Sequence, residues 1–214
     1  MTSAMNQRVL LVRRPQGAPV PDDFRIDMVP AADLGPGEVL VRTLWLSLDP
    51  YMRGRMNEGP SYAPPVDLGE VMQGECVGQV EASADPSFAL GDFVRGHGGW
   101  QSRFVQPARQ LTRLDPATAP LSTALGVLGM PGLTAYAGLR TIARPKAGET
   151  VVVGAASGAV GAIAGQCLTP VQANAYCGKG HHWEGAGCVV DRCRQGEPSG
   201  ETLPDHTDAW TGSL

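Results

Sequence analysis

Short apolar runs, broken by glycine, proline and aspartate, fill the first half of the chain. Five of these runs have the length and the residue types of β-strands, and none of them shows a helical period. Clusters such as Gly35-Pro36-Gly37 and Gly96-His97-Gly98-Gly99 mark turns between them. The pattern predicts an all-β unit, a barrel or a sandwich, with strands over 8–12, 38–46, 76–80, 93–94 and 103–105.

The pattern changes beyond this β unit. Leucine and alanine dominate the stretches 121–128 and 133–142, which predict two helices separated by the corner Gly129-Met130-Pro131-Gly132. The β-branched run 150–153 then predicts a short buried strand, and the small residues of 154–165 predict a tight turn that leads into a closely packed helix. The second part of the chain therefore begins a βα unit.

The turn Gly154-Ala155-Ala156-Ser157-Gly158-Ala159-Val160-Gly161 is the stretch with a clear chemical mechanism. Small residues let the backbone turn sharply, and the helix that follows begins with unpaired amide N–H groups, which suit a pyrophosphate. Glycine spacing of this kind is equally compatible with a strand-to-helix corner that binds nothing. The preceding strand and the two-part organisation of the chain favour the binding interpretation.

A dinucleotide site also needs a second buried strand and, about 20 residues past the glycines, a side chain for the adenosine end. Pro170 is expected to end the helix early, and the segment 174–182 contains no β-branched run, so we expect no second strand there. Lys179 lies at a suitable distance for a phosphate, but without a strand to hold it the sequence favours no such role.

Composition narrows the function classes. The 214 residues are 43% hydrophobic and carry a formal net charge of −4, which argues against nucleic acid as the main partner. No apolar run approaches the ~18 residues of a membrane helix, and the N-terminus lacks the order of a secretion signal. We therefore predict a soluble cytoplasmic protein with no membrane partner.

The averages conceal a break near Gln166. Only six of the last 48 residues are Leu, Ile, Val or Phe, too few to build a core, whereas four of the five cysteines and three of the four histidines lie there. The cysteines and histidines contain no Cys-x-x-Cys pair, which argues against a zinc site. The segment 167–214 is predicted to be disordered.

Several blocks of the sequence resemble a known family in uninterrupted order from residue 5 to residue 166. They resemble the zinc-independent medium-chain dehydrogenase/reductases, in the branch of the prostaglandin reductases, leukotriene B4 dehydrogenases and curcumin reductases. The blocks are Leu48-Asp49-Pro50-Tyr51-Met52-Arg53-Gly54, Met72-Gln73-Gly74, Gly91-Asp92, Gly99-Trp100-Gln101, Leu128-Gly129-Met130-Pro131-Gly132-Leu133-Thr134-Ala135-Tyr136 and the glycine turn through Gly165-Gln166.

This resemblance implies a mixed β and α/β fold. A GroES-like β-barrel domain would occupy residues 1–120, and the first βα unit of an incomplete Rossmann domain would occupy 121–166, followed by the aberrant tail 167–214. It also implies NADPH as cofactor and, as substrate, a small α,β-unsaturated ketone or aldehyde whose C=C bond is reduced. Relatives are often homodimers, through an interface expected to be missing here.

Site residues follow from the same resemblance. Gly158, Ala159, Val160 and Gly161 match the pyrophosphate turn, and Thr134 matches a residue near the nicotinamide. Tyr51 matches a tyrosine of the substrate pocket, although a half-buried tyrosine beside a proline is also an ordinary core residue.

The resemblance implies chemistry without a metal. Zinc-dependent relatives carry a Gly-His-Glu block, and the corresponding residues here are Gln73-Gly74-Glu75, so Gly74 stands where their histidine binds zinc. Their cysteine ligand would fall near Leu46 or Ser47, neither of which can replace it. Activation of the substrate would then depend on hydrogen bonds and positioning.

After Gln166 the chain departs from the family pattern, which continues with Ile-Ala-Lys and further strands. A shifted reading frame would explain the departure, and we expect the resulting truncated chain to be inactive because its cofactor domain is incomplete. One alternative is a non-catalytic remnant whose β domain only binds partners. Another is a quinone reductase of the same superfamily.

Overall fold

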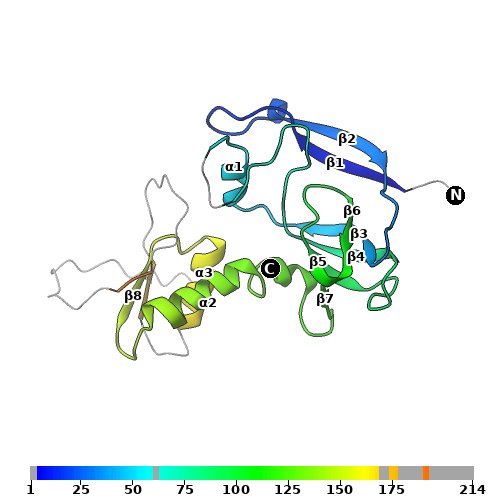
Figure 1. Cartoon of the computed structure of the whole chain (residues 1–214). Coiled ribbons are helices and arrows are strands. Elements are labelled where there is room, and N and C mark those ends of the chain that lie inside the picture. Colours follow the sequence, from blue (N-terminus) through cyan, green and yellow to red (C-terminus); the bar gives the residue numbers. More distant parts are fainter. Residues whose placement is uncertain (1–3, 60–62, 169–173, 178–189, 193–214) are drawn as a thin grey trace.

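The computed structural model describes residues 4–59, 63–168, 174–177 and 190–192. Its first part is built of antiparallel strands in two sheets (Figure 1). The smaller sheet pairs β1 (Met5–Leu11) with β2 (Phe24–Pro30). The larger sheet has the order β6-β3-β4-β5-β7, formed by β3 (Glu38–Leu46), β4 (Cys76–Ser83), β5 (Phe93–Gly96), β6 (Arg103–Pro107) and β7 (Thr112–Leu114).

Three short helices interrupt the strands. The 3₁₀ turns η1 (Pro21–Asp23) and η2 (Ala108–Gln110) flank the sheets, and the single-turn helix α1 (Tyr51–Arg55) follows β3. Met52 and Met56 anchor α1 because they pack with Leu11, Val66 and Met72 in a cluster of their own. This cluster fixes α1 against the smaller sheet.

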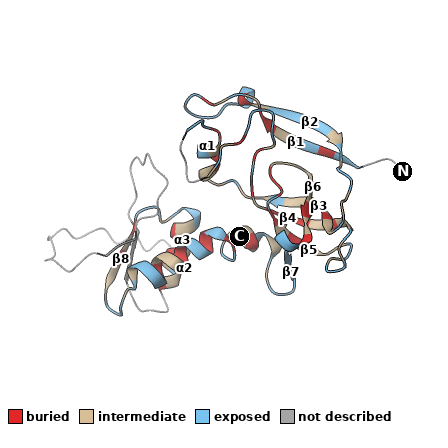
Figure 2. Cartoon of the chain, viewed as in Figure 1, coloured by how far each residue is buried: buried red, intermediate tan, exposed pale blue. Residues whose placement is uncertain are grey.

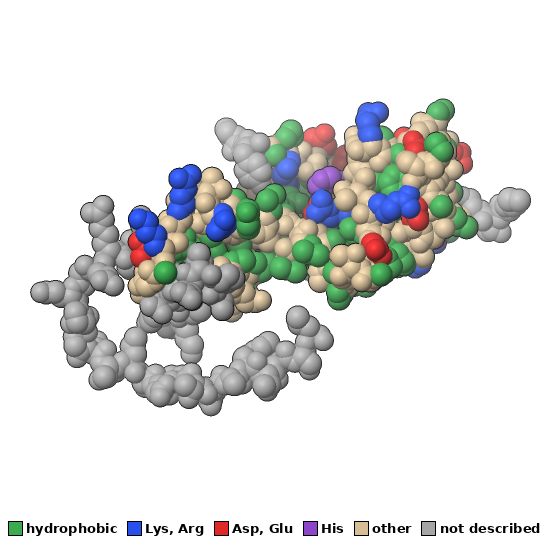
Figure 3. Space-filling view, turned by 90° about the horizontal axis from the view of Figure 1, so that it is seen from below, with side chains coloured by type: hydrophobic (Ala, Val, Ile, Leu, Met, Phe, Trp, Pro, Cys, Tyr) green, Lys and Arg blue, Asp and Glu red, His purple; other side chains and the backbone are tan. Residues whose placement is uncertain are grey.

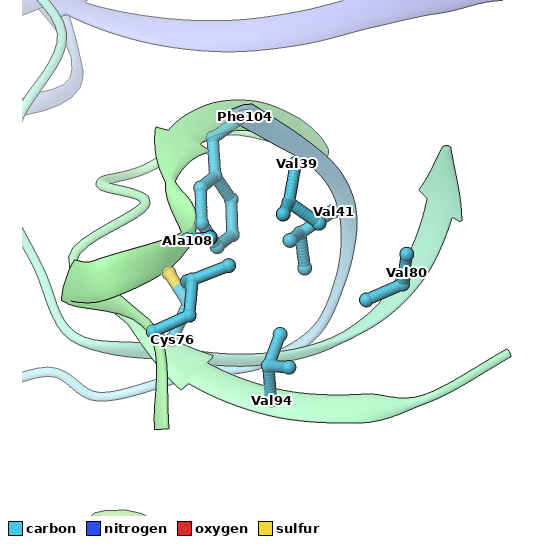
Figure 4. Packing of buried hydrophobic residues seen from close by; sticks show 8 residues of the cluster. Val39, Val41, Cys76, Val80, Val94, Phe104 and Ala108 are labelled. Carbon is cyan, nitrogen blue, oxygen red and sulfur yellow. The ribbon is translucent and has the colours of Figure 1, made fainter. Parts of the chain in front are cut away.

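The core of the larger sheet follows directly from the alternation of its strands. Val39 and Val41 point inward from β3, and Val94 of β5 faces them across the interior (Figure 4). Removing each of these side chains from water contributes about 2 kcal/mol. The other members of the buried cluster are Cys76, Val80, Phe104, Ala108 and Leu111.

The second part is a smaller α/β lobe, which we define as residues 130–168 together with 174–177 and 190–192. Helix α2 (Met130–Ala137) continues as a π-helix, η4 (Gly138–Ala143), and β8 (Thr150–Val153) leads into α3 (Ala159–Leu168). β8 lies between β9 (Asn174–Cys177), which is parallel to it, and β10 (Val190–Arg192), which is antiparallel. Figure 2 shows the buried sides of α2 and α3. The lobe has one buried cluster, to which α2, η4, β8 and α3 contribute Ala135, Leu139, Val151, Val153, Ala164 and Leu168.

The expected fold class, a β domain followed by a βα unit, is confirmed. All five strands predicted in the β unit are present, and β8 and the turn into α3 lie where the sequence places them. α3 ends at Leu168, two residues before the proline expected to stop it. The boundaries proposed for the three regions, 1–120, 121–166 and 167–214, remain predictions.

The structure also contains elements that the sequence did not predict. β2, β7 and α1 were missed because β2 is largely exposed and β7 and α1 have only three and five residues, too few to establish a period. The first predicted helix is a five-residue 3₁₀ turn, η3 (Leu121–Leu125), and the second begins earlier, at Met130.

The expectation that no strand follows α3 was wrong for Asn174–Cys177. β9 pairs in parallel with β8 through backbone hydrogen bonds, which do not require β-branched side chains when an existing strand serves as a template. β8, α3 and β9 therefore form a βαβ unit. Residues 167–168, at the end of α3, and β10 also lie in the segment predicted to be disordered, so that prediction is wrong for them as well. Lys179 and the histidines of this segment lie outside the described residues.

Candidate functional site

A cleft of about 620 Å³ opens on the β domain beside the start of α2. Its walls come from α1, from the segment before β4 and from the loop after β5, with Met130 of α2 at one side. It combines apolar surface with a few polar groups, as small-molecule sites do. The lining residues are Asp49, Tyr51, Arg55, Val71, Met72, Gln73, Gly74, Glu75, His97, Gly98, Gly99, Gln101 and Met130.

Tyr51 lies in this cleft as the first residue of α1. The preceding Pro50 adopts helical torsion angles, and the Met52 N–H donates to the Asp49 carbonyl at 3.0 Å, so the helix begins at the cleft wall. The Arg55 guanidinium lies 5.8 Å from the centre of the Tyr51 ring, and it donates to the Pro64 carbonyl at 2.8 Å. Arg55 therefore lies over the tyrosine ring and is itself fixed by the backbone, and the role of Tyr51 in binding substrate stays a prediction.

The floor of the cleft is packed tightly at Gly74. A Cβ atom there would lie 2.9 Å from Leu46 Cδ1, 3.1 Å from Met52 Cε and 3.3 Å from Trp100 Cδ1. Gly74, which the resemblance aligns with the zinc-binding histidine of other relatives, is thus surrounded by hydrocarbon and aromatic side chains. Among the described residues no three His, Cys, Asp or Glu side chains are grouped so that they could hold a metal.

Cys76 lies just below this floor. Its thiol is fully buried and donates to the Gly99 carbonyl at 3.3 Å. Burial raises the pKa of the Cys76 thiol to about 11, so the group stays protonated at neutral pH. The thiol is a packing group and not a nucleophile.

The glycine turn between β8 and α3 is closely packed against the helix and partly exposed, and its role in binding a pyrophosphate stays a prediction. A Cβ atom at Gly161 would lie 1.9 Å from the Ala155 carbonyl oxygen, so only glycine lets the helix approach the turn this closely. The Gly158 N–H donates to the same carbonyl at 3.0 Å, and the residues around it are exposed. The small exposed residues Gly158 and Ala159 at the start of the ten-residue α3 leave room for a phosphate there.

Thr134 lies away from Tyr51, in a second groove of about 400 Å³ between the two helices of the lobe. Its hydroxyl donates to the Met130 carbonyl at 2.8 Å, one helical turn earlier. The structure brings Thr134 together with Val160 in this groove, whereas Met130 lines the first cleft. The groove is lined by Leu133, Thr134, Ala135, Ala137, Gly138, Ile142, Val160 and Ala164.

Arg55, His97 and Gln101 are cleft residues to which the sequence assigned no role. Gln101 stands within the Gly-Trp-Gln block that carries the family resemblance, which was the one available signal. Arg55 and His97 gave no signal because the cleft assembles segments far apart in the sequence. In the space-filling view hydrophobic and basic side chains share the same face without forming one continuous charged field (Figure 3).

The comparison with protein families identifies the first half of the chain. Residues 7–114 match the model described as the N-terminal domain of oxidoreductase. No helix in the described part of the chain is long and apolar enough to cross a bilayer.

Curated relatives extend the match beyond that domain. The chain is 52% identical over 161 residues to the NADPH-dependent curcumin reductase of Escherichia coli K12, a match that covers 75% of this chain and 47% of that protein. It is 42% identical over 167 residues to the NADP-dependent 2-alkenal reductase of Nicotiana tabacum, covering 75% and 48%. The chain therefore spans about half the length of the curated relatives it matches.

A solved structure has the same arrangement. CurA from Vibrio vulnificus, in complex with NADPH, superposes with a TM-score of 0.73 at 42% identity, and the match covers 80% of this chain and 51% of that chain. The likeness extends over both the β domain and the start of the α/β lobe, because a match of this length exceeds the β domain alone.

Proposed function

The chain belongs to the medium-chain dehydrogenase/reductase superfamily, among relatives named curcumin, prostaglandin and 2-alkenal reductases, and from that premise we propose that its cleft and glycine turn serve NADPH-dependent reduction of the C=C bond of α,β-unsaturated ketones or aldehydes. One observation carries the proposal. Helix α2 joins a partly apolar cleft that contains Tyr51 to the groove beside the glycine turn.

The residues of the turn fit the pyrophosphate of NADPH. Gly158 and its neighbours are small and exposed at the start of α3, and Gly161 keeps the helix close to the turn. Bound there, NADPH supplies a hydride, which is two electrons and one hydrogen nucleus. The hydride adds to the β-carbon of the substrate, and a proton from solvent completes the reduction at the α-carbon.

The protein's contribution is to hold the substrate and to stabilise the charge that develops on its carbonyl oxygen. Tyr51 and the exposed Met130, which line the cleft, supply apolar surface for the substrate. We propose that no metal takes part, because Leu46 and Met52 fill the space around Gly74. Hydrogen-bond donors in the cleft must then stabilise the oxygen.

A chimera tests this function with the cleft and the turn intact. Residues 1–166 of this chain are joined to the second half of the E. coli curcumin reductase, and NADPH absorbance is followed in the presence of an enone. We expect sustained turnover from the chimera and loss of it in the Gly161→Val chimera. A folded chimera that binds NADPH and leaves enones unreduced contradicts the proposal.

The 214-residue polypeptide alone is expected to bind NADPH weakly and to give no sustained turnover. Leu133 and Ile142, which line the groove beside the glycine turn, are 68% and 80% exposed, so this groove is open to solvent. Sustained NADPH consumption by the purified 214-residue chain, in an assay free of other reductases, would contradict this expectation.

The exposed groove on α2 favours a second candidate, a non-catalytic module that binds a ligand or partner without turnover. This module would bind an enone in the cleft, would not respond to NADPH, and would give an inactive chimera. A third candidate, quinone reduction, differs only in substrate, so a naphthoquinone assayed beside the enone in the same chimera distinguishes it.

A further inference from the structure

A line of three side-chain hydrogen bonds runs from β1 to the floor of the cleft. Asn6, which is 6% exposed, donates through Nδ2 to Gln101 Oε1 at 2.9 Å. Gln101 in turn donates through Nε2 to the Gly98 carbonyl at 2.6 Å. At its other end the line is tied to the backbone, because the Arg103 N–H donates to Asn6 Oδ1 at 2.9 Å.

The orientation of both amide side chains is fixed by backbone groups at the two ends of the line, because a backbone N–H can only donate and a backbone carbonyl can only accept. A backbone N–H only donates, so the Asn6 atom facing Arg103 must be the oxygen, and Nδ2 must face Gln101. The Gln101 atom facing Asn6 is then its oxygen, which leaves Nε2 facing Gly98. A backbone carbonyl only accepts, so this orientation is also the one that Gly98 requires.

This arrangement leaves one amide hydrogen of Gln101 unused by the described residues. The Nε2 group carries two hydrogens, and the Gly98 carbonyl takes one of them. Gln101 lines the cleft, near Tyr51 and Met72. Glu75, which also lines the cleft, is paired with Arg95 at 3.5 Å and offers only acceptors, so it cannot bind a carbonyl oxygen.

We propose that Gln101 donates its second amide hydrogen to the carbonyl oxygen of the bound enone, and that Asn6 is a positioning residue that keeps this hydrogen directed into the cleft. This inference rests on the proposed function and adds a specificity residue to it. A site built around an oriented donor rejects a ligand of the same shape that lacks the acceptor, because the donor is then left unpaired.

The test uses the full chain and two probes of nearly equal shape. One is 4-phenyl-3-buten-2-one, and the other is its carbon analogue, in which a CH₂ group replaces the carbonyl oxygen. Binding is measured by NMR titration, with the Gln101 side-chain amide signals as a local reporter. We expect the wild type to bind the enone about tenfold more tightly than the diene, which is the size of one oriented hydrogen bond.

Three variants separate recognition from damage to the fold. Gln101→Met keeps the side-chain length and is expected to lower the enone preference to about one, with diene binding unchanged. Asn6→Asp leaves the cleft lining intact but cannot donate to Gln101 Oε1, so the preference should fall there too. Gln110→Leu, on η2 outside the cleft, is the matched control and should keep the wild-type preference.

The outcomes distinguish failure of this inference from failure of the proposed function on which it rests. If Gln101→Met retains the preference, or weakens both probes equally in a chain with an otherwise native spectrum, Gln101 is not the donor and the inference is overturned while the cleft stands as an enone site. If the wild type binds neither probe, the proposed function fails at the same time. A downfield shift of one Gln101 amide proton, seen with the enone alone, supports the inference directly.

Discussion

The β domain and the α/β lobe differ in how much buried core stabilises each of them. The β domain has two buried clusters, and polar side chains such as Asn6 and Asp23 connect its loops to its strands. The lobe has one cluster of six buried residues, and Leu133, Tyr136 and Ile142 lie exposed on its helices. The cleft therefore lies on a domain with two buried clusters, whereas the glycine turn depends on the single cluster of the lobe.

The substitution Gly161→Ala should produce the largest effect, and only in the lobe. Its new methyl group would lie 1.9 Å from the Ala155 carbonyl oxygen, so the turn must move, at a cost of about 3 kcal/mol. Gly165→Ala on the same helix meets no atom within 4 Å and serves as the control. Hydrogen exchange should show α3 opening in the first variant while the β-domain amides stay protected, and equal loss of protection in both regions would disprove the separation.

Substitutions that truncate leucine side chains should show the same difference between the two regions, with slightly smaller losses in the free energy of unfolding. Leu139→Ala removes a 3% exposed side chain from the lobe and should cost about 2–3 kcal/mol there. Leu11→Ala, in the β domain, should cost a similar amount but also loosen the cleft through Met52 and Met72. Leu133→Ala, at a 68% exposed position, should change the unfolding free energy by less than about 0.5 kcal/mol.

Acid should weaken one corner of the β domain before the lobe responds. Hydrogen bonds from the Val20 N–H and then from Arg13, partly opposed by burial, hold the pKa of Asp23 below its ordinary value of 3.8. The folded pKa is lowered, so the stabilisation is complete above pH ~4 and is lost as the pH falls through the folded value. Asp23→Asn should flatten this part of the pH dependence of unfolding, and an unchanged profile would rule out the carboxylate as its source.

The smallest expected difference between the two regions lies in the alkylation rates of their cysteine thiols. With its pKa raised to about 11 by burial, Cys76 should resist alkylation at pH 8 as long as the β domain is folded. Cys167, on α3, is partly exposed and should react faster. Peptide mapping after brief iodoacetamide treatment measures both, and rapid labelling of Cys76 in native protein would contradict a rigid β domain.

The sequence predicted those parts of the fold whose signal is local. The strand runs of β3 and β4 and the turn around Gly158 carry their own patterns of apolar and small residues. β9 was missed because it forms on the template of β8, a condition that the segment Asn174–Cys177 does not itself reveal. The π-helical turn at Gly138–Ala143 was also missed, since its hydrophobic spacing differs little from that of an α-helix.

The features of the candidate site also fall into those that local sequence predicts and those that depend on contacts between distant segments. Tyr51 and the glycine turn could be predicted because short sequence blocks carry the family resemblance. The approach of Leu46 to Gly74, and the presence of Arg55 and His97 in one cleft, depend on segments that meet only after the sheet forms. The resemblance assigned Tyr51 to the substrate pocket and Thr134 to the nicotinamide end, and the structure places the two residues in separate cavities, the cleft and the groove on the lobe.

The bonds of Asn6 also bear on the order of events during synthesis. They join β1 to residues 95 to 97 positions later, so the ends of the β domain must meet before the cleft floor is complete. A nascent chain can close this loop only after residue 103 has left the ribosome, and contacts so distant in sequence form slowly. Until then β1 exposes its edge, and the substrate cleft is among the last parts of the domain to mature.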